Sequence, residues 1–227
     1  MIYALADTHF DGEQDKPMDI FSSCWENHQE KIRNHWVEII RPEDWVLLAG
    51  DISWAMKLEQ AEEDLRFIDS LPGKKLISRG NHDYWWASLK KMRALGLHTI
   101  DFVQNNAYSV EEYEVVGSRS WLDPQSKEFT AEDQKILDRE LIRLQLSIDS
   151  AKKNRPLIAM IHYPPFNSKK EPNIIHELLK KNNVEICIYG HLHGVGHQQA
   201  VEGLVDGVEY HLTAADFIDF TPKLIRR

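Results

Sequence analysis

The stretch ISRGNHDYWW, residues 77–86, follows a short apolar run and holds five polar side chains, one glycine and three aromatic side chains. Four of the polar residues stand almost side by side where the predicted strand ends: Arg79, Asn81, His82 and Asp83. A strand that enters the core normally ends in simple turn residues, whereas these four side chains can bind or transfer a chemical group. We therefore interpret the end of this strand as part of a functional site.

Short apolar runs rich in Ile, Val and Leu alternate along the chain with longer amphipathic stretches, which is typical of an α/β protein. The apolar runs predict strands at residues 2–6, 45–49, 75–78, 157–161 and 185–189. The amphipathic stretches predict helices at residues 23–40, 57–70, 85–95, 131–152 and 173–182. Alternating segments at residues 107–110, 113–117 and 205–213 predict antiparallel strands and point to a second sheet. No repeat or linker divides the chain, so we expect one domain over residues 1–227.

Composition argues against several classes of protein. The apolar runs are too short to span a bilayer and the first residues lack the features of a signal peptide, so we expect a cytoplasmic protein without membrane association. Cys24 and Cys187 are too few for a disulfide framework or a structural zinc site. A net charge of −9 argues against binding of long nucleic acid, which needs clustered Lys and Arg. No feature indicates an obligate protein partner.

Each of the five main predicted strands ends in residues able to bind a metal ion. In chain order these residues are Asp7 and His9, Asp51, Asn81 with His82 and Asp83, His162, and His191 with His193. In an open α/β sheet, polar residues at the carboxyl ends of the strands meet at one ligand crevice. We therefore expect these side chains to lie together.

Spacing and ligand chemistry support a metal site. Residues two apart in an extended segment face the same side, so each Asp-x-His or His-x-His pair can reach one pocket. A mixture of carboxylate, amide and imidazole ligands suits Mn, Fe, Co or Zn better than copper or calcium. Because seven or more such ligands exceed what one ion needs, the sequence predicts two divalent metal ions.

The ordered motifs resemble those of the calcineurin-like metallophosphoesterases. The matching motifs are Asp7-x-His9, Gly50-Asp51, Gly80-Asn81-His82-Asp83, His162 and Gly190-His191-x-His193, which span most of the chain. The segments GDISWA and HYPPF are also similar to small bacterial phosphohydrolases of this superfamily. The resemblance implies a four-layer α/β/β/α sandwich, in which two mixed sheets are flanked by helices.

The resemblance also implies a role for each matching residue. Asp7, His9 and His193 would hold the first metal, Asn81, His162 and His191 the second, and Asp51 would bridge both. His82 would face the substrate as the general acid, with Asp83 orienting it, and Arg79 stands where protein phosphatases of the superfamily carry a phosphate-binding arginine. A metal-bound hydroxide would then cleave a small phosphorylated substrate, with Mn, Fe or Zn as the metal.

Several alternatives stay open. Within enzymes, the runner-up is a phosphodiesterase or nuclease. A binding scaffold that has lost catalysis is a second alternative, but it predicts missing ligands or a missing His82, and all are present. Some aromatic residues either contact the substrate or pack in the core, namely Trp54, Tyr84, Trp85, Trp86 and Trp121. His197 either lines the pocket or belongs to a loop.

Overall fold

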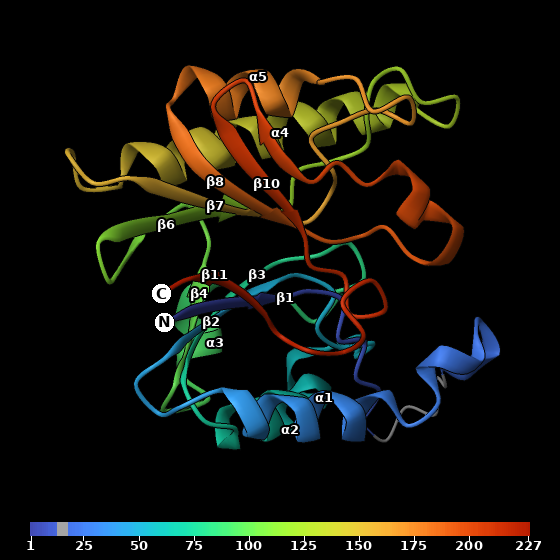
Figure 1. Ribbon diagram of the computed structural model, residues 1–227, viewed down its shortest axis with the longest axis vertical. Helices are drawn as coiled ribbons and strands as arrows, with labels where there is room; N and C mark the ends of the chain where they lie inside the picture. The colour runs from blue at the N-terminus through green and yellow to red at the C-terminus, as the bar shows by residue number, and fades with distance from the viewer. Residues whose placement is uncertain (13–17) are drawn as a thin grey trace.

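Four layers make up the protein in the computed structural model, which describes residues 1–12 and 18–227. Two β-sheets face each other in the middle, and helices cover the outer face of each sheet (Figure 1). One outer layer contains α1 (His28–Ile39), α2 (Leu58–Ser70) and α3 (Leu89–Arg93), and the other contains α4 (Ala131–Asp149) and α5 (Ile174–Lys181). The predicted α/β/β/α sandwich is therefore confirmed.

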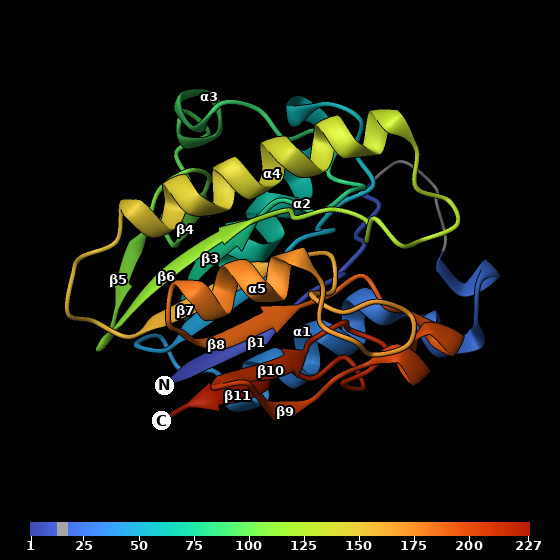
Figure 2. The ribbon, with the colours of Figure 1, turned by 90° about the horizontal axis from the view of Figure 1, so that it is seen from above.

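The first sheet has the strand order β11-β1-β2-β3-β4. Its strands are β1 (Ile2–Leu5), β2 (Trp45–Ala49), β3 (Lys74–Ser78), β4 (Ile100–Val103) and β11 (Lys223–Arg226). β1 to β4 are parallel, whereas β11 is antiparallel to β1 and brings the C-terminus beside the N-terminus (Figures 1 and 2). Parallel strands joined through helices place all their carboxyl ends at one end of the sheet.

The second sheet has the strand order β5-β6-β7-β8-β10-β9. Its strands are β5 (Tyr108–Val110), β6 (Tyr113–Ser118), β7 (Leu157–Ile161), β8 (Val184–Tyr189), β9 (Gly203–Val205) and β10 (Val208–Leu212). The four central strands are parallel, and the two edge strands pair antiparallel with their neighbours. α4 and α5 lie across this sheet when it is seen from above (Figure 2).

Alternation along β1 shows how the strands fill two cores at once. Ile2 and Ala4 belong to the core between the two sheets, whereas Tyr3 and Leu5 belong to the core under α1 and α2. Successive side chains of a strand point to opposite faces, so a strand buried on both faces must be apolar throughout. This explains why the main strands appear in the sequence as continuous apolar runs.

Two helices begin later than the sequence predicts. α1 begins at His28 instead of residue 23, because Asn27 takes a left-handed conformation (φ 53°) and separates α1 from a short 3-10 helix, Ser23–Trp25. α3 begins at Leu89 instead of residue 85, since Ser88 caps it and the preceding Trp85 is buried in the core. Tertiary packing thus overrides the helical pattern at both starts.

The strand predictions need two corrections. β4 and β11 were not predicted as strands of the first sheet, and β6 and β10 pair parallel with β7 and β8, so each is antiparallel only to its edge neighbour, β5 or β9. Short edge strands carry weak periodicity, and a pairing between distant segments such as β1 and β11 leaves little trace in the local sequence.

Within the described residues, no helix is both long and apolar enough to cross a membrane.

Candidate metal centre

The carboxyl ends of five strands meet at one end of the sandwich. β1, β2 and β3 of the first sheet lead to Asp7, Asp51 and Asn81, whereas β7 and β8 of the second sheet lead to His162 and His191. These residues are divided between the two sheets of the sandwich that the resemblance implies, so the site lies across the seam between the sheets.

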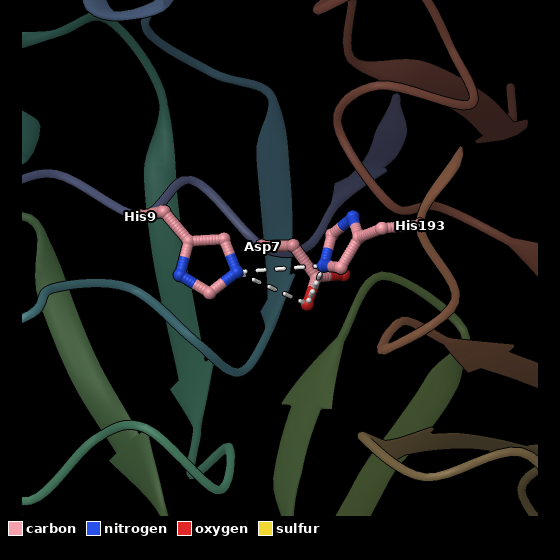
Figure 3. A group of neighbouring side chains, drawn as sticks. All are labelled: Asp7, His9 and His193. Carbon is pink, nitrogen blue, oxygen red and sulfur yellow. Dashed lines mark hydrogen bonds and ion pairs between the residues drawn. The ribbon is translucent and has the colours of Figure 1, made fainter. Parts of the chain in front are cut away.

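Asp7, His9 and His193 form the first ligand group (Figure 3). His9 Nε2 and His193 Nε2 lie 3.4 Å apart, and they lie 3.9 Å and 3.4 Å from Asp7 Oδ1. His9 and Asp7 are almost fully buried, while the side chain of His193 is 30% exposed. Two ring nitrogens and a carboxylate oxygen therefore converge on one small space that is open to solvent on the His193 side.

Asn81, His162 and His191 form the second ligand group. Asn81 Oδ1 lies 2.8 Å from His162 Nε2 and 3.0 Å from His191 Nδ1. The Asn81 oxygen comes from the first sheet and both imidazoles come from the second, so the two sheets must be held in register to form this group.

Asp51 lies between the two ligand groups. Its Oδ2 is 3.8 Å from His9 Nε2 in the first group and 3.3 Å from His162 Nε2 in the second. The backbone N–H of His82 donates to Asp51 Oδ1 at 2.8 Å, which fixes the carboxylate. Asp51 is thus within reach of both ligand groups.

The backbone around these ligands adopts unusual conformations. Asp7, His9, Asp51 and His191 all have positive φ, between 46° and 72°. Such values are unfavourable for side chains other than glycine and persist only where the surrounding structure imposes them. Strain of this kind concentrates at functional sites, and here it affects four of the seven converging residues.

Two glycines allow the strand ends to approach each other closely. A Cβ atom on Gly80 would overlap Asp51 Oδ1, and one on Gly190 would overlap Asp7 Oδ2. Each glycine immediately precedes a ligand residue, so its missing side chain lets the ligands of neighbouring strands share one space. This is the structural reason for the Gly-Asn and Gly-His pairs in the sequence.

Second partners orient the imidazoles. His162 Nδ1 lies 3.0 Å from the backbone oxygen of Ala49, so its Nε2 faces the centre. His193 Nδ1 lies 2.8 Å from Asp216 Oδ1, and Asp216 Oδ2 accepts from the Gly194 N–H. A carboxylate behind a metal-binding histidine holds the ring and increases its basicity. Asp216 is not among the site residues predicted from the sequence, although it follows β10 as the candidate ligands follow their strands.

The carboxylates and imidazoles of the centre shift the pKa values of one another. Burial alone would lower the pKa of both imidazoles, but Asp51 raises the pKa of His162 to about 9 and Asp7 raises that of His193 to about 10. Burial would likewise raise the pKa of Asp7 and Asp51, but the same histidines hold both below their usual values. The centre therefore attracts positive charge, and a bound cation would displace the protons on these rings.

His82 lies beside the ligands without joining either group. Its ring packs against Trp54, with centroids 4.5 Å apart, and lies 5.8 Å from the His9 ring. Burial lowers the pKa of His82, and the negative charge of Asp51 opposes this effect. The position next to the centre agrees with the expected substrate-facing role, and proton donation from this ring is favoured on the acidic side of neutrality.

Asp83 has partners other than the expected ones. Its carboxylate accepts from the backbone N–H groups of Asp51, Ile52 and Gly80 at 2.7–2.9 Å and from Trp85 Nε1 at 3.0 Å. Among the described residues, the hydrogen bonds of Asp83 include none to the His82 ring. Asp83 therefore holds the loop that carries Asp51 and positions His82 only through the backbone.

Arg79 faces away from the ligand groups. It lines a separate cavity with Arg119, Glu140 and Arg143, whereas the pocket at the ligands is lined by other residues. The expectation that Arg79 holds a substrate phosphate at the metals is not supported by this placement.

The aromatic residues divide into two sets. Trp54 stacks on His9 (4.9 Å) and lines the pocket, whereas Trp85 is buried in the core and Trp86 donates to Gln104. Tyr84 is exposed beside His82, and Trp121 packs against Tyr163. His197 Nε2 lies 3.2 Å from Asp216 Oδ2, so it supports the carboxylate behind His193 instead of the pocket itself.

The converging atoms fit divalent cations. Imidazole nitrogens at 3.4 Å from each other, with carboxylate oxygens nearby, form a cluster of electron-pair donors once the rings lose their protons. Carboxylate, amide and imidazole together suit borderline first-row metals. Both triads, Asp7–His9–His193 and Asp7–Asp51–His162, can hold such an ion.

The comparison with known families supports this interpretation of the site. The sequence profile of the calcineurin-like phosphoesterase family matches residues 1–195. The chain belongs to this family. The protein is therefore a metal-dependent phosphoesterase, and the residues that converge at the strand ends are its candidate metal ligands.

Solved structures share the fold of this phosphoesterase. One is a protein of unknown function from Aquifex aeolicus, with 19% identity, a TM-score of 0.51, and coverage of 98% of this chain and 94% of that one. Another is a phosphopantetheinyl hydrolase from Mycobacterium tuberculosis, with 12% identity, a TM-score of 0.56, and coverage of 94% and 88%. None of the curated proteins compared with the chain matches it. At these identities the likeness establishes the fold alone.

Proposed function

We propose that the phosphoesterase binds two divalent cations and hydrolyses phosphate esters of small molecules. The observation that carries this proposal is the position of Asp51 between two complete ligand groups, 3.8 Å from His9 Nε2 and 3.3 Å from His162 Nε2. A single carboxylate in this position could serve both ligand groups when cations are bound.

Divalent cations held by these ligand groups would supply polarisation of the phosphoryl group and activation of a water molecule. The protein's own residues do the remaining work. The buried ligands hold their geometry through Asp83, Asp216 and the Ala49 carbonyl, so little reorganisation is needed during the reaction. His82, whose ring joins neither ligand group, donates a proton to the departing oxygen.

Residues of the candidate centre line two cavities. The first has a volume of about 310 Å³ and an apolar wall that includes Phe21, Trp25 and Trp54. The second has a volume of about 550 Å³ and a more polar lining that includes Lys127 and Lys169. His191 lines both cavities. A phosphoryl group at the ligands therefore has space on two sides, and this favours small phosphodiesters as a second candidate substrate class.

The test is hydrolysis of p-nitrophenyl phosphate and bis-p-nitrophenyl phosphate after removal of metals with a chelator and addition of Mn²⁺. We expect metal-dependent release of p-nitrophenol from at least one ester, and faster turnover of the diester if both cavities hold substrate groups. Absence of metal-dependent turnover of either ester would contradict the proposed enzyme and favour a binding scaffold.

A further inference from the structure

A further polar cavity, distinct from the two described above, lies apart from the metal ligands. It forms where the loops after β3 and β4 meet the end of β6 and α4. Its volume is about 40 Å³, and its lining includes Arg79, Arg119, Glu140 and Arg143 but none of the candidate metal ligands. Arg79 follows β3, Arg119 follows β6, and the other two residues lie on α4. Segments far apart in the sequence thus bring three guanidinium groups to one space.

The charges in this cavity do not balance. Glu140 is the single carboxylate of the lining, and it pairs with both Arg119 (3.4 Å) and Arg143 (2.6 Å). Within the described residues, the buried Nε of Arg79 has no hydrogen-bond partner, and the carboxylates of Asp83 and Glu140 act on its guanidinium only through their charge. The lining therefore carries a net charge of +2, from three arginines and one glutamate, in a chain whose net charge is −9.

Buried donors in the cavity lack partners. Within the described residues, the buried Nε–H groups of Arg79 and Arg119 donate no hydrogen bond, and the Arg119 side chain is only 10% exposed. Packing of Arg119 on the Trp121 ring, 4.2 Å from its centroid, explains where the guanidinium lies but leaves its Nε–H unused. A buried cation with unused donors is unfavourable unless an anion or a water molecule completes its hydrogen bonds.

We propose that this cavity is an anion site that binds a phosphate group. Planar guanidinium groups recognise phosphate oxygens through paired N–H donors. Three guanidinium groups and one carboxylate carry a net charge of +2, which one phosphate dianion would neutralise. The site is linked to the metal centre through Arg119, whose backbone oxygen accepts from the N–H of His162 at 3.2 Å. The bound group is either free inorganic phosphate, which the proposed hydrolysis releases, or a second phosphate carried by the substrate.

Calorimetric titration of inorganic phosphate into the metal-loaded protein tests the site. We expect a binding component that Arg143→Gln and Arg79→Gln each weaken about tenfold or more, because each removes charge-assisted hydrogen bonds. Arg139→Gln is the matched control, since Arg139 is an exposed arginine on the same helix that does not line the cavity. It should change the dissociation constant less than twofold.

Two results would overturn the anion site. One is a phosphate isotherm that is the same in the native protein and in both cavity variants, and the other is equal weakening by Arg139→Gln, which would mean general surface charge. Phosphate binding is measured without turnover, so the two proposals can fail separately. A protein that hydrolyses no ester but binds phosphate in a way that Arg143→Gln weakens would refute the proposed hydrolysis and support the anion site.

Kinetics with two substrates identify the source of the phosphate group. If the substrate supplies it, Arg143→Gln raises KM for fructose 1,6-bisphosphate and leaves KM for fructose 6-phosphate unchanged. If free phosphate is the ligand, both KM values stay unchanged while the Arg143-sensitive binding of inorganic phosphate persists.

Discussion

An Asp51→Asn variant is expected to lose metal binding and to lose hydrolysis by about 10³-fold or more. Asp51 lies between the two ligand groups, and its Oδ2 is within 3.8 Å of an imidazole nitrogen in each. An amide of the same size removes the negative charge that draws two cations together. Metal ions contribute several kcal/mol to the stabilisation of a phosphoryl transition state, and each 1.4 kcal/mol corresponds to about a tenfold change in rate.

Asp44→Asn is the matched control for this variant. Asp44 is a buried carboxylate just before the other end of β2, where it binds the N-terminal amine and the N–H of Arg41. The control should keep the metal content and the turnover of the folded protein, even though its stability falls. Metal analysis and kcat/KM for bis-p-nitrophenyl phosphate measure both variants, and normal metal content and activity in Asp51→Asn would disprove a bridging role.

A His82→Ala variant is expected to keep its metals and to lose activity by about 10²-fold or more, as is typical for a general acid. The His82 ring packs on Trp54 and lies outside both ligand groups, so its removal should leave the metal ligands in place. Because a poor leaving group needs the proton more than p-nitrophenolate does, the loss should be larger for an alkyl phosphate ester than for p-nitrophenyl esters.

His98→Ala serves as the control for His82, since His98 is exposed and distant from the ligands in the chain. It should behave as the native protein with both kinds of ester. Loss of metal from His82→Ala, or an equal loss of rate with alkyl and aryl leaving groups, would mean that His82 is not the general acid.

The candidate ligands could be predicted because each one follows a strand that is readable from the sequence. Asn81 and His162 come from runs such as β3 and β7, whose apolar residues predict strands, and parallel pairing brings the carboxyl ends to one side. Asn81 Oδ1 and His162 Nε2 lie 2.8 Å apart although the two residues follow strands of different sheets. The local sequence pattern only suggested a second sheet, and the family resemblance implied it.

Other parts of the site could not be predicted from local pattern. The partners of Asp83 and the carboxylate of Asp216 depend on loops that pack together only in the folded chain. The position of Arg79 in a separate cavity could not be predicted either. Glu140 follows Arg79 by more than sixty residues and lies near it only because α4 packs on the second sheet. Motifs identify which residues act, whereas tertiary contacts decide how they are oriented.

The most direct test of a dinuclear phosphoesterase is the initial rate of ester hydrolysis while Mn²⁺ is titrated into chelator-treated native protein. The two ligand groups joined by Asp51 predict that activity rises until two equivalents of metal are bound per chain and then stays constant. Full activity at one equivalent, or activity that does not depend on added metal, would contradict the account.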